Sequence, residues 1–171
     1  MLSRVSHKIK HRKIPNDNFT TPAELAIKCI DMVPLKTGDT VLDAALGMGI
    51  FYNNYPNYVS KKFTTESDLF LLDNSIQSVD WIITNPPYSH LDMWFKQSCQ
   101  LCRKGFAYLL GIHNITPKRI EMVNKMGFGL TQLYLCKVYE WFGMSCFVVF
   151  QRGAANIVSY DRKVYYESHT P

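Results

Sequence analysis

The chain has 171 residues, of which 47% are hydrophobic and 19% charged, so it holds enough apolar material for one domain with a real core. This composition excludes a disordered chain, and the length excludes a large accessory domain. No apolar stretch approaches the roughly 20 residues of a membrane span, and no apolar segment of a signal peptide follows the basic N-terminus. We therefore expect an intracellular, cytoplasmic protein with no membrane partner.

Positive charge is concentrated at the N-terminus. The formal net charge is +5, and every acidic residue lies beyond residue 13. Residues 1–14 therefore form a basic arm, which we expect to be flexible. Its cations Lys8, Lys10, Arg12 and Lys13 are candidates for contacts with nucleic-acid phosphates, because neutralised phosphates release bound counterions. The alternative is a solvated tail that binds nothing specific.

The cysteine pattern predicts free thiols and no metal. Five cysteines are an odd number in a chain without a signal peptide, which favours a reducing compartment. Cys99 and Cys102 form a CxxC pair, but a structural zinc needs four ligands and no second pair has suitable spacing. We expect these two thiols to lie on one face of a helix.

The first predicted elements are a helix, a strand and a glycine turn. Thr21 followed by Pro22 is a typical helix start, and Pro34 ends the apolar periodicity that follows. Residues 40–43 are predicted to form a short buried strand that leads directly into a turn with two glycines. Pro56, with asparagines just before it, predicts a very short helix or none after this turn.

Strands and helices alternate through the rest of the chain. Strands are predicted over residues 61–65, 68–72, 79–84, 106–110, 130–138 and 146–151, and helices over residues 91–102 and from about 119 to a C-cap at Gly127. The pattern predicts an α/β fold, with a mostly parallel central sheet, an antiparallel edge strand and helices on both faces. We expect one domain over residues 15–156 and a C-terminal extension over residues 157–171.

Two predicted loops carry unusual residues. Ligands bind beyond the carboxyl ends of parallel strands, where both loops are expected. The first loop starts at Asp43 and continues to Gly47 and Gly49, whose missing side chains let a cofactor approach the backbone. The second is Asn85-Pro86-Pro87-Tyr88, in which two prolines hold the Asn85 side chain and the Pro86 carbonyl as rigid acceptors. Each loop alone also fits a turn that binds no ligand.

Together and in this order, the glycine turn and the Asn85–Tyr88 motif resemble the S-adenosylmethionine-dependent amino-methyltransferases, specifically the adenine-N6 group. The segment Phe19-Thr20-Thr21-Pro22 ahead of them fits the same pattern. The resemblance covers residues 19–151 and is strongest to the compact, phage- and virus-type members. It implies a Rossmann-like class I methyltransferase fold, with S-adenosylmethionine as the cofactor.

The resemblance also implies roles for individual residues. Cofactor contacts are implied for Phe19, Thr21, Pro22, Asp43, Ala45, Gly47, Gly49, Glu66, Asp68 and Leu69. The Asp43 carboxylate is expected to hold the cofactor ammonium or the loop amides, and either Glu66 or Asp68 the ribose. The catalytic segment is Asn85, Pro86, Pro87 and Tyr88, and Tyr88 is expected to stack on the target base. Trp141 and Phe142 either add a second aromatic contact or pack their loop.

The chemistry agrees with this assignment. An exocyclic adenine amine is a poor nucleophile, because its lone pair is delocalised into the ring. Hydrogen bonds from the amine to the Asn85 side-chain oxygen and the Pro86 carbonyl favour a pyramidal nitrogen and stabilise the developing positive charge. We therefore expect methyl transfer to the N6 of adenine in nucleic acid, with DNA favoured over RNA. We expect a short recognition sequence, or sequence specificity that comes from a homodimer or a second subunit.

Two alternatives remain open. The same four-residue motif occurs in enzymes that methylate a glutamine side-chain amide in proteins, although these usually carry a peptide-recognition domain. The other alternative is a non-catalytic nucleic-acid-binding subunit with a methyltransferase fold. It is favoured by Ala44 and Ala45, which replace the proline and aromatic that often follow the acidic residue in the family.

Overall fold

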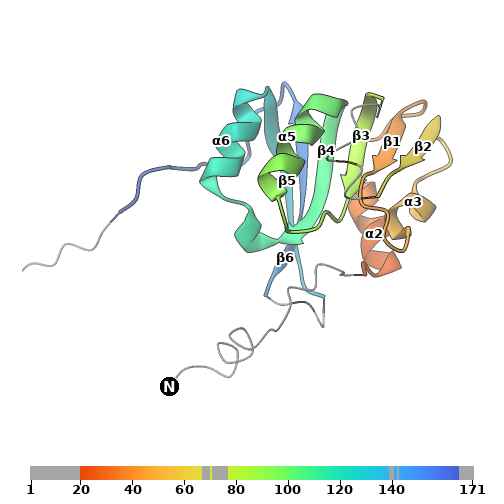
Figure 1. Ribbon diagram of the computed structural model, residues 1–171, viewed down its shortest axis with the longest axis horizontal. Helices are drawn as coiled ribbons and strands as arrows, with labels where there is room; N and C mark the ends of the chain where they lie inside the picture. Colours follow the sequence, from red (N-terminus) through yellow and green to blue (C-terminus); the bar gives the residue numbers. More distant parts are fainter. Residues whose placement is uncertain (1–19, 67–69, 71–76, 139–140, 142, 166–171) are drawn as a thin grey trace, which may run out of the picture.

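The computed structural model describes residues 20–66, 70, 77–138, 141 and 143–165, and within them six strands form one sheet (Figure 1). The strand order is β2-β1-β3-β4-β6-β5. The strands are β1 (Thr40–Asp43), β2 (Lys61–Thr64), β3 (Val79–Thr84), β4 (Cys102–Gly111), β5 (Phe128–Cys136) and β6 (Ser145–Arg152). The described helices are α2 (Ala23–Asp31), α3 (Ile50–Asn54), α5 (Leu91–Leu101), the 3-10 helix η1 (Ile112–Asn114) and α6 (Pro117–Lys125).

The sheet has the predicted α/β character. Strands β2, β1, β3 and β4 run parallel to one another, whereas β6 is antiparallel to both β4 and β5. The antiparallel strand therefore lies one position inside the edge, and β5 is the edge strand itself. This order places the carboxyl ends of β1, β2, β3 and β4 along one edge of the sheet.

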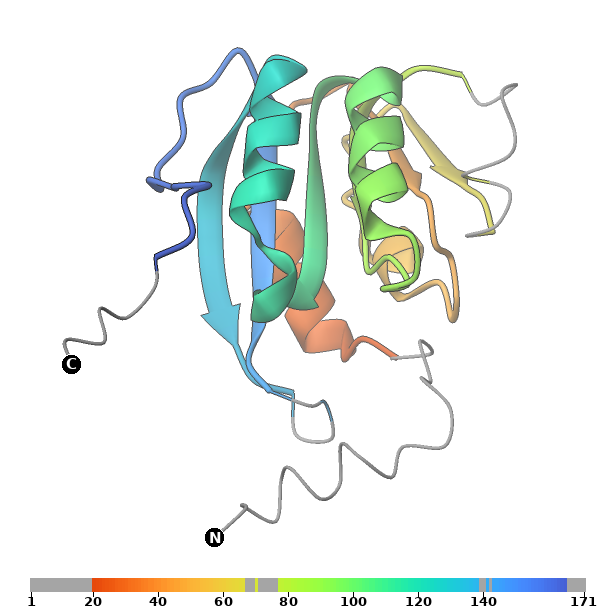
Figure 2. The same cartoon turned by 60° about the vertical axis from the view of Figure 1, so that its left-hand side comes forward.

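Helices cover both faces of the sheet, as predicted. Figure 2 shows α5 and α6 side by side on one face, with α2 on the other. Side chains of β3 alternate between the two layers: Trp81 and Ile83 pack with α2 and α3, and Ile82 packs with α5. All six residues of β3 are buried, because the strand is central and covered on both faces.

Most predicted elements are present, with shifted ends. Helix α2 begins after Pro22, which is its N-cap, and α3 has only five residues before the chain reaches Pro56. The prediction of one helix face for both thiols is wrong, since α5 ends at Leu101 and Cys102 is the first residue of β4. Cys102 pairs with Val79 in the sheet, so β4 starts earlier than predicted. None of the described helices is both long and apolar enough to cross a membrane.

Two further predictions concern loops. The strand predicted over residues 68–72 falls outside the described residues except for Phe70, whose amide donates a helix-type hydrogen bond to the Glu66 carbonyl. The described part of the predicted extension, residues 157–165, contains no helix or strand. Just before it, the Asn156 side chain accepts a hydrogen bond from the Leu130 amide, which protects the start of the edge strand.

Candidate active site

The carboxyl edge of the sheet brings the two unusual loops together. Asp43 ends β1 and Thr84 ends β3, and these strands are parallel neighbours. The Thr84 hydroxyl donates a hydrogen bond of 2.7 Å to Asp43 Oδ1, which joins residues 41 positions apart in the chain. The glycine turn and the Asn85–Tyr88 motif therefore start from one hydrogen-bonded point.

The Asp43 carboxylate is buried, at 1% exposure, and neutral groups bind it. Besides the Thr84 hydroxyl, it accepts hydrogen bonds from the Tyr52 amide (3.2 Å) and the Ala45 amide (3.4 Å). Burial raises the pKa of Asp43, and these three hydrogen bonds oppose the rise. Among the described residues, no Lys, Arg or His forms an ion pair with Asp43. The site thus holds a desolvated carboxylate that favours a cation nearby.

The turn after β1 needs its glycines for the backbone conformation. Gly47 and Gly49 have φ angles of 47° and 71°, in the left-handed region that side chains disfavour. The Gly49 amide closes the turn on the Leu46 carbonyl at 2.6 Å, and the Leu46 amide donates to the Thr65 carbonyl beyond β2. A Cβ on Gly47 would lie 3.8 Å from the Ala45 carbonyl oxygen, an ordinary contact, so the φ angle and not crowding favours glycine here.

The Asn85 side chain is bound by Thr21, a residue just before α2. Its Nδ2 donates to the hydroxyl of Thr21, at 3.3 Å, and Thr21 is itself 5% exposed. Because the oxygen and nitrogen of an amide lie on opposite sides, this bond directs Asn85 Oδ1 away from Thr21. Asn85 is half-buried and Pro86 is buried, so the segment has little freedom. The structure thus joins Thr21, for which a cofactor contact is predicted, to the Asn85–Tyr88 motif.

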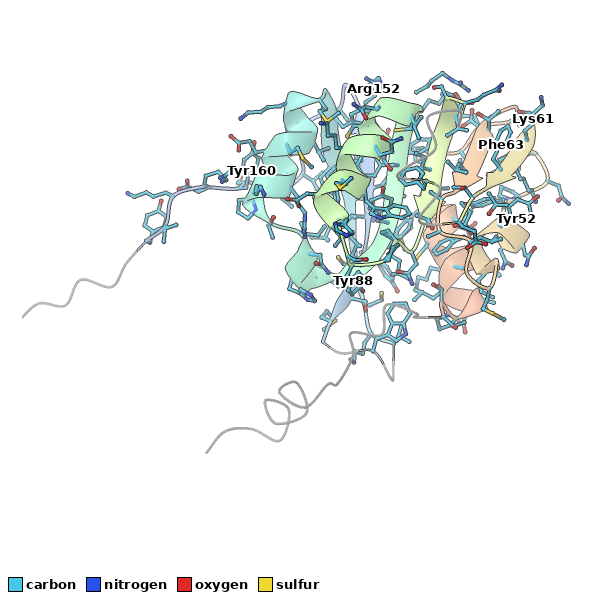
Figure 3. All side chains as sticks on the ribbon, in the orientation of Figure 1. Tyr52, Lys61, Phe63, Tyr88, Arg152 and Tyr160 are labelled. Atoms are coloured by element: carbon cyan, nitrogen blue, oxygen red, sulfur yellow. The ribbon has the colours of Figure 1, made fainter. Side chains whose placement is uncertain are left out.

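Tyr88 and its neighbours complete this edge. Figure 3 places Tyr88 at the opposite end of the sheet from Arg152. The half-buried Tyr88 packs against the α5 layer, and its hydroxyl accepts a hydrogen bond from the Gly111 amide at 2.9 Å. His90, just after the motif, has a φ of 60°, which turns the chain directly into α5.

The remaining predicted site residues differ in their surroundings. Pro22 is exposed at the start of α2, Pro87 is half-buried, and Glu66 is exposed two residues after β2. Trp141 is 7% exposed and packs in the α2 layer. A stacking ring must present a face, so this burial favours the packing role of Trp141 over a base contact. The predicted residues outside the described part of the chain are Lys8, Lys10, Arg12, Lys13, Phe19, Asp68, Leu69 and Phe142.

Sequence reasoning missed Thr84, Tyr52 and Gly111. Thr84 carried a signal, because a hydroxyl stands at the end of an apolar β-branched strand, directly before the motif. Tyr52 and Gly111 contribute only their main-chain amides to the bonds with Asp43 and Tyr88. Main-chain donors leave no residue-type signal in a sequence. These contacts become visible only once the strands are aligned.

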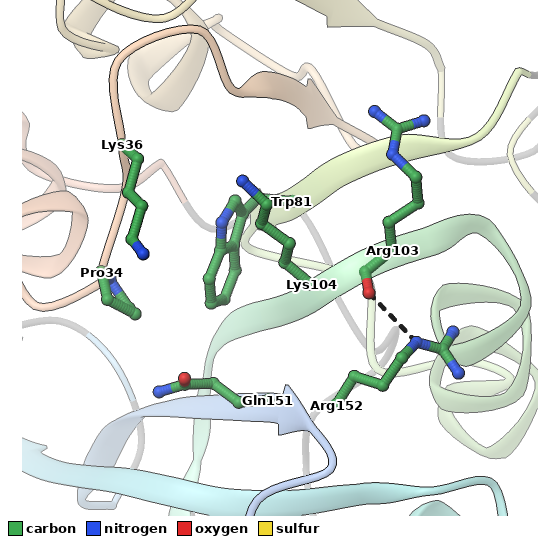
Figure 4. Close-up of a pocket in the computed structure, with 7 residues that line it drawn as sticks. All are labelled: Pro34, Lys36, Trp81, Arg103, Lys104, Gln151 and Arg152. Carbon is green, nitrogen blue, oxygen red and sulfur yellow. Dashed lines mark hydrogen bonds between the residues drawn. The ribbon is translucent and has the colours of Figure 1, made fainter.

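The opposite, amino edge of the sheet holds a hollow of about 410 Å³ (Figure 4). Its walls include four cationic side chains and are formed by Pro34, Lys36, Trp81, Arg103, Lys104, Gln151 and Arg152. Arg103 and Lys104 pair with Asp80 and Asp39, respectively. Arg152 donates to main-chain carbonyls, among them that of Cys102 at the start of β4. Since internal partners hold three of the four cations, we regard this edge as a stabilising cluster.

Comparisons with known proteins identify the fold. No family model and no curated protein matches the chain. A solved structure from Listeria monocytogenes, assigned to the class I S-adenosylmethionine-dependent methyltransferases, has a TM-score of 0.66 and 12% identity. It matches over 94% of this chain and 68% of its own. The chain thus has the Rossmann-like fold of class I methyltransferases.

Two further structures have the same fold. The M protein of the type I restriction enzyme EcoKI has a TM-score of 0.62 and 10% identity, over 82% of this chain and 45% of its own. This chain therefore spans less than half the length of that subunit. Magnesium protoporphyrin IX methyltransferase from Synechocystis, solved with bound S-adenosylmethionine, has a TM-score of 0.55 and 11% identity, over 76% and 77% of the two chains.

The residues at the carboxyl edge fit this cofactor. Asp43 is a buried carboxylate bound by neutral donors, which suits a ligand that carries positive charge. Gly47 is exposed in the turn, so a ligand can approach its backbone, whereas Gly49 is buried and a Cβ there would lie 3.2 Å from the Asn53 side chain. The described residues contain no group of three or more His, Cys, Asp or Glu able to hold a metal ion.

Proposed function

We propose that this protein transfers a methyl group from S-adenosylmethionine to the exocyclic N6 of adenine in nucleic acid, with DNA the preferred substrate. The observation that carries the proposal is the hydrogen bond between Thr84 and Asp43, which sets the rigid Asn85–Tyr88 segment beside the glycine turn. The fold is shared with the M protein of a type I restriction enzyme and also with a structure from Pyrococcus horikoshii assigned as an RNA methyltransferase, so the preference for DNA rests on the resemblance to the phage- and virus-type adenine methyltransferases.

The bound cofactor supplies an activated methyl group, so the protein has mainly to align the amine with it. Asn85 Oδ1 and the Pro86 carbonyl accept hydrogen bonds from the adenine amine and stabilise the positive charge that develops on its nitrogen. The bond from Asn85 Nδ2 to Thr21 fixes which end of the amide faces the base. No strong general base is required, because the ammonium product loses its proton readily. Tyr88 stacks on the base.

Asp43 serves the cofactor side of the reaction. Its bonds to the Ala45 and Tyr52 amides hold both arms of the glycine turn, so the loop-amide role is the one that its contacts support. Its negative charge, set among neutral donors, also attracts the positive charge of the cofactor. Asp43 is therefore a binding residue that also positions the turn.

The test is to incubate the protein with methyl-labelled cofactor and, in parallel, with DNA, RNA and cell-extract protein. We expect label in nucleic acid, and a loss of at least ~100-fold in the Asn85→Ala variant, because one preorganised acceptor is removed. Calorimetry of cofactor binding is the control, and both proteins should bind equally. Label found only in protein would favour the glutamine-amide alternative, and a wild type without saturable heat would favour a non-catalytic subunit.

The basic arm is proposed to hold nucleic acid. Lys8, Lys10, Arg12 and Lys13 each release a counterion when they neutralise a phosphate, so binding weakens as salt rises. Deletion of residues 1–13 should weaken nucleic-acid binding and reduce its salt dependence, with cofactor affinity unchanged. Fluorescence anisotropy with a labelled oligonucleotide at several salt concentrations measures this slope. An unchanged slope would show that the arm binds no phosphate.

A further inference from the structure

The last three residues of β4 extend beyond the end of its neighbouring strand β3. The last residue of β3 is Thr84, which pairs with Tyr108, whereas β4 continues three residues further, to Gly111. On its other side β4 stays paired with β6, where Gly111 lies opposite Ser145. Past Thr84 the chain leaves the sheet as the Asn85–Tyr88 motif. The amides of β4 that face this gap therefore need partners other than a strand.

The Tyr88 hydroxyl fills one of these positions. The Gly111 amide donates to Tyr88 Oη at 2.9 Å, as a neighbouring strand's carbonyl would accept in a sheet. The tip of the Tyr88 ring is thus fixed to the backbone of β4, although Tyr88 itself belongs to the loop after β3. Phenylalanine at this position would keep the ring and lose the bond.

The His113 ring contacts the Tyr88 ring and restricts its movement. The two rings meet edge to face, with centroids 6.4 Å apart and planes at 90°. His113 is exposed in the 3-10 helix that follows β4, and its ring covers Gly111 so closely that a Cβ there would lie 2.7 Å from His113 Cε1. Glycine at residue 111 is therefore needed for this arrangement.

We propose that Gly111 and His113 are positioning residues for Tyr88: they hold its ring in the orientation that stacks on the target base. The proposal rests on the methyltransferase function proposed above and assigns the Tyr88 hydroxyl as an anchor outside the chemical step. A ring that is fixed beforehand need not be immobilised when the substrate arrives, so the anchor lowers the KM for nucleic acid. It leaves the affinity for the cofactor unchanged.

The variant that tests the anchor is Tyr88→Phe, with Tyr55→Phe as a matched control. The Tyr55 hydroxyl also forms a hydrogen bond with the main chain, donating to the Ile83 carbonyl at 2.6 Å, but Tyr55 is buried in the other layer of the protein. For Tyr88→Phe we expect the KM for nucleic acid to rise about fivefold, with a smaller change in kcat and none in cofactor affinity. For Tyr55→Phe we expect stability to fall and the KM to stay the same.

A second measurement needs no substrate. Hydrogen exchange of the Gly111 amide, followed by NMR, should be slow in the wild type and in Tyr55→Phe and faster in Tyr88→Phe. His113→Ala keeps the Tyr88 hydroxyl and should raise the KM about twofold, because only the edge contact is lost. Unchanged Gly111 exchange in Tyr88→Phe would overturn the anchor, and an unchanged KM would overturn its role in substrate binding. A wild type that methylates no nucleic acid would instead refute the proposed function, with the exchange result still deciding the anchor.

Discussion

A buried aspartate stands at each end of β1, and the two are bound in opposite ways. Asp39, just before the strand, is 2% exposed and accepts hydrogen bonds from Lys104 Nζ, the Trp81 indole and the Lys36 amide. Asp43, at its end, is 1% exposed and is bound by neutral groups. Asp39 at the amino edge is thus paired with a cation of the protein itself, whereas Asp43 at the carboxyl edge has only neutral partners among the described residues and suits a cationic ligand.

The difference separates stability from function along one sheet. The cluster of Asp39, Asp80, Arg103 and Lys104 joins the starts of β1, β3 and β4. The carboxylates are largely buried, but the cations are about half-exposed, at 50% for Arg103 and 44% for Lys104, so the loss of a carboxylate costs mainly the hydrogen bonds of its buried donors. An uncompensated carboxylate at the other edge lowers stability and is retained where a ligand completes it. Substitutions at the two edges should therefore affect different measurements.

Asp39→Ala should have the largest effect on stability. Removing this carboxylate leaves the indole N–H of the buried Trp81 and the Lys36 amide without their acceptor, so the free energy of unfolding should fall by about 3 kcal/mol. Cofactor affinity of the folded protein should stay within about twofold, since the site lies at the opposite edge. Urea unfolding and calorimetry measure the two quantities. A large loss of cofactor affinity would mean that the two edges are not separate.

Asp80→Asn should lower stability by about 2 kcal/mol at neutral pH, because a charged hydrogen-bond acceptor of Arg103 is lost. Burial alone would raise the pKa of Asp80, but hydrogen bonds from Arg103 and Thr40 lower it to about 2. Its contribution to stability is therefore present above pH 4 and is lost as the pH falls toward 2. Urea unfolding of both proteins between pH 2 and 7 should show the difference disappear at acid pH. A constant difference would contradict a charge-based role.

Asp43→Asn should weaken cofactor binding about tenfold, because the negative charge beside the glycine turn is removed. At neutral pH the free energy of unfolding should change by about 1 kcal/mol, which is less than the change for Asp39→Ala. Burial raises the pKa of Asp43, so its contribution to stability is present at acid pH and is lost as the pH rises through that raised value. The pH profile should thus have the opposite sign to that of Asp80→Asn. Equal cofactor affinity in wild type and variant would show that the charge of Asp43 is not used.

The sequence predicted features that depend on local pattern. The apolar run over residues 79–84, ended by two prolines, specifies the central strand β3, and Pro56 limits α3 to five residues. The closeness of Asp43 and Asn85 follows from a general property of parallel sheets, whose strands end at a common edge. These parts of the fold and of the site needed no knowledge of side-chain packing.

Features set by long-range packing were not predictable. No glycine or proline separates α5 from β4, so nothing local indicates that Cys102 begins a strand. Trp141 is buried in the same hydrophobic cluster as residues of α2, which is more than 100 residues away in the chain. The bond between Tyr88 and Gly111 depends on the register that lets β4 extend past β3. Each of these three features depends on how segments distant in the sequence pack together.

The most direct test of the account is the chemical position of the transferred methyl group. Nucleic acid treated with the wild-type protein and cofactor should be digested to nucleosides and separated by mass spectrometry. We predict N6-methyladenine from the wild type, and at least ~100-fold less from Asn85→Ala, with both proteins folded and equally able to bind cofactor. Methyl groups on any other nucleoside, or equal amounts of N6-methyladenine from both proteins, would contradict the role assigned to Asn85 and Pro86.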